Sequence, residues 1–467
     1  MGMTDASATN ANATNANLPV AGMTDDDLLA IARGAGTPAF VFDAAVFRAR
    51  LRAVRGILGP DIELAYSIKA NPFLIGAAEA EGLRLEVCSP GELAACEAWR
   101  VPAGRVIYSG VCKREADVRE ALAYGAGVFT AESPRQLELV ARAAAAAGMT
   151  VPVLLRLSAG SQFGMSREDL LAIVDRRAAL AGVRLVGIHY FVGTQRAKLK
   201  HQRRELEKLV ALLDELEAEH GWRPERLEYG PGLAVPLFAD EDFSDTLAPA
   251  RELAPALWEV AGRVDLTVEM GRFLATECGV YLASVVDDKT DRGTRYVLVD
   301  GGINHLVYYG QTMAMKVPLV TNLTAAVRGA DSAAPAATET PASTGAPAEM
   351  TALTVTETPE VELCGSLCTT ADVLVRSLPL TDPQVGDVLA FRNAGAYSVT
   401  EGIGLFLSRD LPAIVIRRGP GDWEVVRRSR PTWPINVPEA FASPPRPPVP
   451  AGFLHPRGHP RPIPSKM

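Results

Sequence analysis

Short apolar runs alternate with longer amphipathic segments over the first two thirds of the chain. The short runs are rich in Val, Ile, Leu and aromatic residues, whereas the segments between them are rich in Ala, Leu, Glu and Arg and are typical of helices. Eight strand–helix units over about 220 residues favour a closed parallel (β/α)8 barrel, although periodicity alone also permits an open doubly wound sheet. The eight predicted strands lie near residues 62–67, 84–88, 105–109, 127–131, 151–157, 184–191, 226–230 and 265–269.

Helical spacing almost disappears after the eighth run, which predicts a second, mainly β domain. Thr37–Asp43 adds one more strand ahead of the barrel. We therefore expect a barrel over residues 44–290 and a β domain made of residues 23–43 and 291–428. The strand-like segments of the second part are Tyr296–Val299, Val361–Leu363, Val373–Leu378, Val388–Phe391 and Ile414–Ile416.

Three segments have a biased composition. Residues 1–22 are mostly Ala, Asn and Thr with few large apolar side chains, so we expect a disordered arm. Residues from about 328 to 360 are rich in Ala, Thr, Pro, Ser and Glu, and they interrupt strand-like sequence as a surface insertion would. The Pro-rich tail at 429–467 is unsuited to regular structure.

The composition fits a globular enzyme of 467 residues, 48% of them hydrophobic. A net charge of −8 and a pI near 5.5 argue against a nucleic-acid surface. No apolar run approaches the roughly 20 residues that span a bilayer, and the N-terminus lacks a signal-peptide profile. The six scattered cysteines do not resemble a disulfide framework, and Cys364 and Cys368 lack a second ligand pair for zinc. These features predict a cytoplasmic protein with no metal, membrane or nucleic-acid partner.

The segment Tyr66-Ser67-Ile68-Lys69-Ala70-Asn71-Pro72 places a single lysine at the end of the first barrel strand. A lone lysine at a strand end is more often a surface residue than a functional one. This segment, however, closely resembles the cofactor-lysine motif of the fold-type III pyridoxal-phosphate-dependent decarboxylases, which include diaminopimelate, ornithine and arginine decarboxylases. The resemblance implies that Lys69 carries pyridoxal phosphate as a Schiff base.

Further matches follow the other barrel strands in the order of that family. Each match is weak alone, because Gly-Pro-Gly is usually a plain turn and a strand-end arginine is usually a surface ion pair. Their joint order makes the resemblance specific, and active sites of such barrels gather at the carboxyl ends of the strands. The cofactor-binding residues implied by the resemblance are Lys69, Glu86, Arg156, His189, Phe191, Thr194, Gly230, Gly232, Glu269, Arg272 and Tyr397.

The chemistry of the cofactor accounts for these residue types. Glu269 would keep the pyridine nitrogen protonated, so that the ring accepts electrons from the carbanion, through a quinonoid intermediate, when carbon dioxide leaves. Gly230 and Gly232 would let the backbone approach the phosphate, and Arg272 would add a charge-assisted contact. The chain departs from the family motifs G-G-G and E-P-G-R at Pro231 and Met270, neither of which removes a charge.

Two matches lie in the β domain. The segment 365–372 resembles the family motif G-P-x-C-[DE]-x-x-D, which enters the active site of the partner subunit, and this implies a homodimer with shared sites. Cys368 would then protonate the carbanion, and Asp372 would contact the distal amine of the substrate. The segment 394–397 is similar to the G-A-Y segment of the family, which puts Tyr397 near the phosphate or the Schiff base. The purely structural alternatives are that Cys368 is a small buried residue and that Tyr397 is an interface or core tyrosine.

Three departures from the family concern the cofactor ring and the substrate. Phe191 replaces the histidine that usually stacks on the cofactor ring, and an apolar ring can still stack. Thr369 stands where diaminopimelate decarboxylases have a glutamate, and Tyr308 stands where they have an arginine for the distal carboxylate. The resemblance therefore implies a decarboxylase of an amino acid or a conjugated amino acid, and the departures at Thr369 and Tyr308 disfavour meso-diaminopimelate as the substrate.

Two alternatives stay open. A racemase of the same fold would place an arginine at the pyridine nitrogen, so Glu269 favours decarboxylation. A non-catalytic cofactor-binding or regulatory homologue is the second alternative, and the retained Lys69, Cys368 and Asp372 speak against it.

Overall fold

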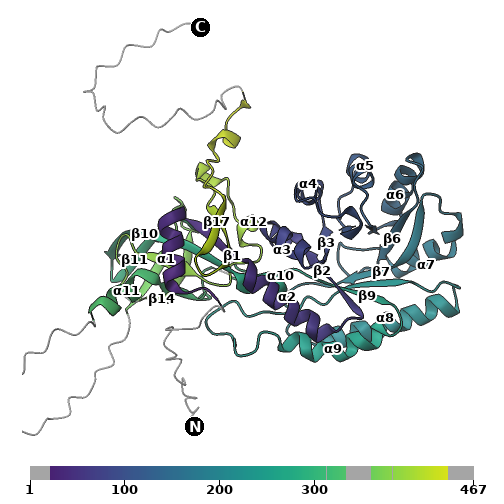
Figure 1. Ribbon diagram of the computed structural model, residues 1–467, viewed down its shortest axis with the longest axis horizontal. Coiled ribbons are helices and arrows are strands. Elements are labelled where there is room, and N and C mark those ends of the chain that lie inside the picture. The colour runs from purple at the N-terminus through teal and green to yellow at the C-terminus, as the bar shows by residue number, and fades with distance from the viewer. Residues whose placement is uncertain (1–21, 312, 333–358, 381, 440–467) are drawn as a thin grey trace, which may run out of the picture.

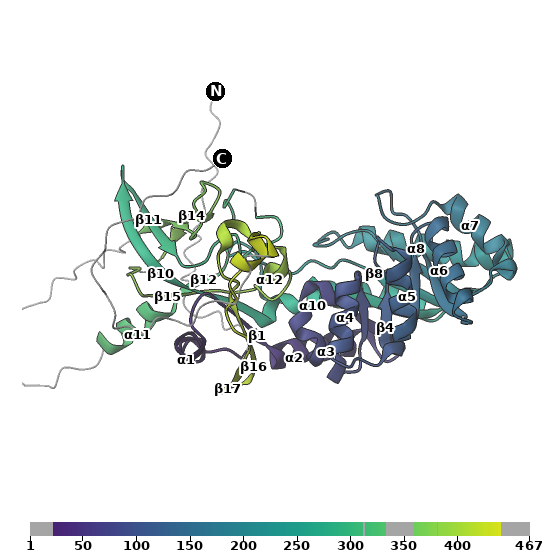
Figure 2. The same ribbon diagram turned by 90° about the horizontal axis from the view of Figure 1, so that it is seen from above.

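The structure, a computed structural model, describes residues 22–311, 313–332, 359–380 and 382–439. It consists of a barrel and a β-sheet body, which lie beside each other in Figures 1 and 2. Within the described ranges, every helix is too short or too polar to span a lipid bilayer.

The three biased segments fall largely outside the described residues. All of the predicted arm except Gly22 lies outside, as do residues 333–358 of the insertion and 440–467 of the tail. Helix α11 (Leu323–Ser332) enters the first residues of the insertion, and a single 3₁₀ turn (Trp433–Asn436) lies in the described part of the tail.

Eight parallel strands close into a barrel in chain order, which confirms the predicted (β/α)8 architecture. Closure is made by β2 and β9, with Leu64 opposite Val268. The strands are buried along most of their length, as expected where helices cover a parallel sheet. The barrel strands are β2 (Ile62–Ser67), β3 (Arg84–Val87), β4 (Val106–Tyr108), β5 (Val128–Ala131), β6 (Val151–Arg156), β7 (Val183–Phe191), β8 (Arg226–Gly230) and β9 (Asp265–Met270).

Local sequence accounts for the helices around the barrel. Ser89 and Ser133 each precede a proline, and each hydroxyl accepts a hydrogen bond from a backbone N–H in the first turn of the following helix. Leucines at three- and four-residue spacing, from Leu206 to Leu216, bury one face of α8. The barrel helices are α2 (Ala44–Leu58), α3 (Ile75–Ala80), α4 (Pro90–Ala98), α5 (Glu115–Tyr124), α6 (Pro134–Ala146), α7 (Arg167–Asp175), α8 (Lys200–Ala218), α9 (Ala248–Ala261) and the short α10 (Arg272–Ala275).

The second body is a nine-stranded sheet in the order β14-β13-β11-β10-β1-β16-β17, with β15 paired to β10 and β12. This confirms the mainly β character predicted for the second part of the chain. Its strands are β1 (Ala39–Asp43), β10 (Gly279–Asp291), β11 (Thr294–Val299), β12 (Val320–Asn322), β13 (Glu360–Cys364), β14 (Val373–Pro379), β15 (Val388–Phe391), β16 (Ala413–Gly419) and β17 (Asp422–Arg427), and α12 (Ser398–Glu401) lies between β15 and β16.

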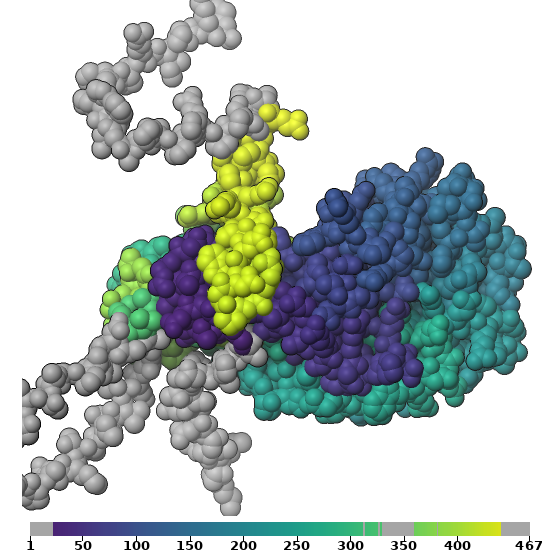
Figure 3. All heavy atoms as spheres, viewed as in Figure 1, coloured from purple at the N-terminus to yellow at the C-terminus, as the bar shows by residue number. Residues whose placement is uncertain are grey.

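The N-terminal strand β1 lies inside this sheet, antiparallel to β10 and parallel to β16. Helix α1 (Asp25–Ala35) packs on the same strands through Leu28 and Ile31. The buried Arg417 of β16 forms ion pairs with Asp27 and Asp43. Figure 3 shows the purple N-terminal residues side by side with the yellow C-terminal ones. Strand β1, which lies within the Thr37–Asp43 segment, thus pairs with strands from the second part of the chain.

The boundary between the two bodies is a proposal. A division at residue 290 leaves most of β10 with the barrel, but β10 pairs with β1, β11 and β15 of the sheet. We therefore propose a boundary near Cys278, where the chain passes directly into β10.

Candidate active site

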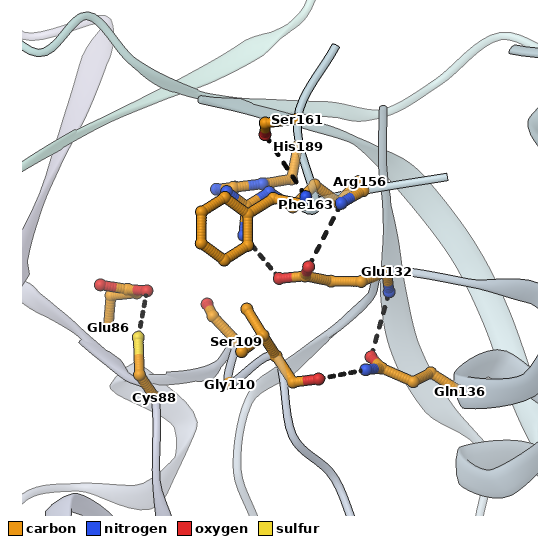
Figure 4. A network of polar contacts seen from close by, with 12 residues as sticks. Glu86, Cys88, Ser109, Gly110, Glu132, Gln136, Arg156, Ser161, Phe163 and His189 are labelled. Atoms are coloured by element: carbon orange, nitrogen blue, oxygen red, sulfur yellow. Dashed lines mark hydrogen bonds and ion pairs between the residues drawn. The ribbon is translucent and has the colours of Figure 1, made fainter. Parts of the chain in front are cut away.

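Lys69 lies at the mouth of the barrel, in the 3₁₀ turn Ile68–Ala70 that follows β2. Its Nζ atom is 2.5 Å from Glu86 Oε2 and 3.6 Å from Glu269 Oε1. The Cys88 sulfur is 3.4 Å from the same nitrogen, and its S–H group donates to Glu86 over 2.9 Å, as Figure 4 shows. Burial opposes the charge of Lys69, but the two carboxylates raise the pKa of its amine well above the ordinary value.

The Glu269 carboxylate is held by three neighbours. Ser67 donates to Oε1 over 2.7 Å, and His189 Nε2 lies 3.2 Å from Oε2. Burial opposes ionisation, but the charge of Lys69 and the hydrogen bonds from His189 and Ser67 lower the pKa of Glu269. The structure thus presents an ionised, buried carboxylate near the lysine.

Arg156, the last residue of β6, is buried and paired with Glu132. Its Nη1 atom is 2.5 Å from Glu132 Oε1, and its guanidinium lies 5.0 Å from the Phe163 ring centre and 5.9 Å from that of Phe191. The backbone N–H of Gly164 donates to the other oxygen of Glu132 over 3.2 Å. Figure 4 shows this network beside Cys88 and Glu86. The ion pair fixes the arginine without using all of its donors.

Gly230 and Gly232 form a crowded turn after β8. Gly232 has φ +59°, and a Cβ atom there would lie 1.7 Å from the Gly193 carbonyl oxygen. A Cβ atom on Gly230 would lie 2.4 Å from the Phe191 ring. Only glycine fits either position, because the turn after β7 packs directly on this one. Thr194 lies partly buried in that same turn.

The sheet body contributes Tyr397 to the mouth of the barrel. Its backbone N–H donates to the Ala70 carbonyl over 2.6 Å, and Asn71 Nδ2 donates to the Gly395 carbonyl over 2.8 Å. Tyr397 itself has φ +68°, a strained conformation for a tyrosine. The two hydrogen bonds attach the lysine turn of the barrel to the sheet body.

Arg272 lies between two tyrosine rings. Its guanidinium carbon is 4.4 Å from the ring centre of Tyr397 and 4.8 Å from that of Tyr309. Burial lowers the pKa of Arg272, although nothing in the physiological range will deprotonate it. The arginine is therefore held by aromatic contacts and keeps donors for an anion.

The barrel mouth fits a polar ligand. Several buried polar atoms have no hydrogen-bond partner among the described residues, and six of them come from the carboxyl-terminal halves of barrel strands or from the residues just after them. Buried polar groups are normally satisfied, so this concentration indicates a missing partner with several acceptors and donors. Pyridoxal phosphate, with its phosphate, ring nitrogen and hydroxyl group, has that character. The six atoms are Ser109 Oγ, Thr130 Oγ1, Arg156 Nε, His189 Nδ1, Glu228 Oε1 and Arg272 Nε.

The residues predicted in the β domain are placed differently. Cys368 is exposed on the connection between β13 and β14. Asp372 is buried, and its two oxygens accept the backbone N–H groups of Ile303 and Leu367 over 2.8 and 2.6 Å. Its carboxylate thereby joins two loops, and contact with a substrate amine stays a prediction.

Tyr308 and Thr369 are the other two predicted substrate residues. The Tyr308 side chain is buried, and its hydroxyl donates to the Arg392 carbonyl over 2.6 Å. Thr369 is partly exposed beside Cys368. The Tyr308 hydroxyl is thus already engaged within the sheet body.

Sequence reasoning missed several residues of the site. Glu132 follows β5 and Glu228 lies in β8, and both could have been found by the rule that polar residues at the carboxyl ends of barrel strands are functional candidates. Glu228 faces Glu269, and burial and that like charge raise its pKa well above the ordinary value. Nothing in the sequence singled out Cys88 or Tyr309 except position: Cys88 lies two residues after Glu86, and Tyr309 lies next to Tyr308.

The comparison with known proteins agrees with this geometry. The family model described as "Pyridoxal-dependent decarboxylase, pyridoxal binding domain" matches residues 44–276. A diaminopimelate decarboxylase of Actinosynnema pretiosum subsp. auranticum is 31% identical over 392 residues, which cover 78% of this chain and 80% of the relative. An L-glutamyl-[BtrI acyl-carrier protein] decarboxylase of Niallia circulans is 26% identical over 425 residues, covering 86% and 93% of the two chains.

Solved structures support the fold. The diaminopimelate decarboxylase from Helicobacter pylori complexed with L-lysine superposes with a TM-score of 0.73 at 17% identity, covering 88% of this chain and 99% of that one. That similarity concerns the arrangement of barrel and sheet.

Proposed function

Because this chain belongs to the pyridoxal-dependent decarboxylases, we propose that it acts on an amino acid whose side-chain end is joined to a larger carrier group. The enzyme is a pyridoxal-phosphate-dependent amino-acid decarboxylase, as its relatives are. The proposal concerns its substrate, the roles of its residues and its assembly.

The substrate proposal rests on one observation. Tyr308 and Asp372, the residues predicted to meet the distal group of the substrate, already make hydrogen bonds within the protein. Tyr308 uses its hydroxyl on Arg392, and Asp372 uses both oxygens on backbone N–H groups. Thr369 brings no charge. A free distal carboxylate would therefore lack a cationic partner, and an unpaired charge costs a few kcal/mol, or roughly two orders of magnitude in specificity.

A thioester-linked acyl amino acid removes that requirement. Linkage through the side-chain carboxyl group neutralises the distal end and leaves the α-carboxylate free to depart. The similarity to a decarboxylase of a glutamyl group on an acyl-carrier protein supports this substrate class.

When bound, the cofactor would act as an electron sink that stabilises the carbanion formed as carbon dioxide departs. Lys69 would attach it, and Glu269, held ionised by Ser67 and His189, would keep a proton at the ring nitrogen. Gly230, Gly232, Thr194 and Arg272 would bind its phosphate. Phe191, which packs on Gly230, would offer an apolar face to the ring.

We also propose a homodimer with shared sites. The Cys368 thiol is exposed in the single chain, whereas a thiol that delivers a proton to the substrate has to be enclosed at the lysine. A second subunit that inserts its own segment 365–372 over the barrel mouth would enclose it. All six cysteines are unpaired, which suits a cytoplasmic location.

The test is comparative kinetics. Purified enzyme is given L-glutamyl-pantetheine thioester, meso-diaminopimelate, ornithine, lysine, arginine and carboxynorspermidine, with release of carbon dioxide as the readout. We expect a kcat/KM for the thioester at least about 100-fold above that for meso-diaminopimelate. A clear preference for meso-diaminopimelate would overturn the proposed substrate class and leave the family assignment intact.

A further inference from the structure

A basic segment lies immediately beside the predicted phosphate-binding turn. Between Thr194 and Glu205 the chain reads Gln-Arg-Ala-Lys-Leu-Lys-His-Gln-Arg-Arg and contains no acidic residue. We define the basic cluster as Lys198, Lys200, Arg203 and Arg204, all of which are exposed. The net charge of −8 gives no sign of this cluster, because it is a sum over the whole chain.

The fold puts the basic cluster on the active-site face of the barrel. It spans the loop after β7 and the first residues of α8, and such loops surround the site in (β/α)8 barrels. The backbone N–H of Arg196 donates to the Gly232 carbonyl over 2.9 Å, which ties this loop to the glycine turn. A partner bound to the cluster would thus lie next to the entrance of the site.

The cluster is electrostatically unfavourable for the helix that carries it. Cations at a helix N-terminus oppose the helix dipole, and like charges three or four residues apart, as between Lys200 and Arg203 or Arg204, add repulsion. The first turn of α8 has no acidic residue, whereas α1 and α7 begin with aspartates and glutamates. Helix α8 thus carries a lysine where these two helices carry carboxylates.

The cluster also lacks internal compensation. In the part of the chain that the structure describes, no carboxylate lies within 4.0 Å of the charged groups of its four residues, and the Arg203 guanidinium donates only to the Glu252 carbonyl. The neighbouring Arg196, by contrast, is paired with Glu205. Four cations without counter-charges form a local positive field in an acidic protein, which attracts an anionic partner.

We propose that the basic cluster is the docking surface for the acidic face of a carrier protein that presents its thioester-linked amino acid to the barrel mouth. This inference rests on the proposed function, because only a carrier-linked substrate brings a protein partner to this face. The carrier would bind the cluster through charge complementarity while its flexible arm enters beside the Gly193–Gly232 contact.

The experiment compares two double charge reversals of equal net change. Lys200→Glu with Arg204→Glu reverses two of the four charges, which brings the net charge of the cluster to zero, and it adds acids near the α8 N-terminus, where they favour the helix. Arg142→Glu with Arg223→Glu is the matched control, because both arginines are exposed and one follows the opposite end of α8. The cofactor-loaded enzyme, its two variants and phosphopantetheinylated BtrI carrier protein without an amino acid are used to measure dissociation constants by fluorescence anisotropy.

We expect the cluster variant to bind the carrier at least about tenfold more weakly, and to lose a similar factor in kcat/KM for L-glutamyl-BtrI, with kcat/KM for L-glutamyl-pantetheine unchanged. The control variant should match the unmodified enzyme, and raising the salt concentration should weaken carrier binding by both of these proteins much more than by the cluster variant.

The outcomes separate the two hypotheses. Equal carrier binding by both variants would overturn the docking surface, even where L-glutamyl-BtrI is decarboxylated and the proposed function stands. Failure to decarboxylate either thioester would overturn the proposed function, whereas loss of carrier binding in the cluster variant would still support the surface. Cluster-dependent binding of inorganic phosphate, anionic vesicles or duplex DNA without binding of the carrier would overturn the assignment of a carrier partner.

Discussion

Glu269 Oε2 lies 3.2 Å from His189 Nε2, and this contact helps to hold a buried carboxylate in its ionised form. The second oxygen accepts a hydrogen bond from Ser67 and faces Lys69 over 3.6 Å. An anion fixed in this way can stabilise a proton on a ring nitrogen only while it keeps its charge. The site therefore depends on the charge of Glu269 more than on its shape.

Glu269→Gln should reduce turnover far more than cofactor binding. The amide keeps the size of the side chain and can still accept from Ser67, but it cannot hold a pyridinium proton. We expect kcat to fall by at least about 100-fold, with a cofactor dissociation constant within about tenfold of the original value. Steady-state kinetics and a cofactor titration followed by absorbance check this.

Glu228→Gln is the matched control for that variant. Glu228 is buried in the neighbouring strand β8, and burial together with the like charge of Glu269 raises its pKa and favours its neutral form, so an amide changes its charge less than at Glu269. Equal losses of turnover in the two variants would mean that the charge of Glu269 has no special role.

Lys69→Ala should abolish covalent attachment of the cofactor. Lys113 is the rival nucleophile, because burial lowers the pKa of its amine to about 8 and leaves part of it neutral near pH 7. Its Nζ, however, donates to the Ser109 carbonyl over 3.0 Å, which directs it at the backbone. Borohydride reduction followed by peptide mass spectrometry should find the cofactor on Lys69 in the unmodified enzyme and in Lys113→Ala. A reduced adduct on Lys113 would contradict the assignment.

Mixing two inactive variants should restore activity where the sites are shared between subunits. Lys69→Ala and Cys368→Ala each damage every site of their own homodimer, but a mixed dimer contains one site with both residues. Random exchange of subunits should recover roughly a quarter of the original activity. Subunit exchange is verified separately by mass spectrometry of differently tagged chains, and full exchange without recovered activity would indicate self-contained subunits.

The sequence was sufficient for the architecture because each barrel strand has its own apolar run and is followed by a segment of helical composition. It also singled out Lys69, Glu86, His189 and Glu269, which the structure brings together through contacts among themselves. These residues follow strand ends, where topology alone determines that they meet.

Residues in irregular segments were harder to predict. The sequence does not tell which of Tyr308 and Tyr309 contacts the site, because this depends on backbone turns that no periodicity describes. In the structure Tyr309 stacks on Arg272, whereas Tyr308 is buried. Similarly, the role of Asp372 could not be derived from its motif, because its hydrogen bonds join it to Ile303, distant in the sequence.

The buried His305 of the sheet body should make stability depend on pH in the acidic range. Its Nδ1 atom lies 3.0 Å from the Tyr281 hydroxyl, and its Nε2 atom lies 3.0 Å from the Asp410 carbonyl. Nε2–H donates to that carbonyl, so the neutral ring leaves Nδ1 to accept from the tyrosine. Burial lowers the pKa of His305 from 6.5 to about 4, because a charged imidazolium would lose its hydration there, and the charges of Arg427 and Arg409 act in the same direction.

A histidine with a lowered pKa in the folded state stabilises the fold above pH 6.5, and its contribution is lost as the pH falls from 6.5 through about 4, since the unfolded chain binds the proton first. The loss should reach roughly 3 kcal/mol of unfolding free energy. His305→Gln can keep one donor and one acceptor but does not titrate, so its stability should fall less between pH 6.5 and 4 in urea unfolding followed by tryptophan fluorescence. His201→Gln, at an exposed position, is the control and should keep the original pH dependence. If His305→Gln and the unmodified enzyme lose the same free energy over this range, proton uptake at His305 does not govern the acid sensitivity of the sheet body.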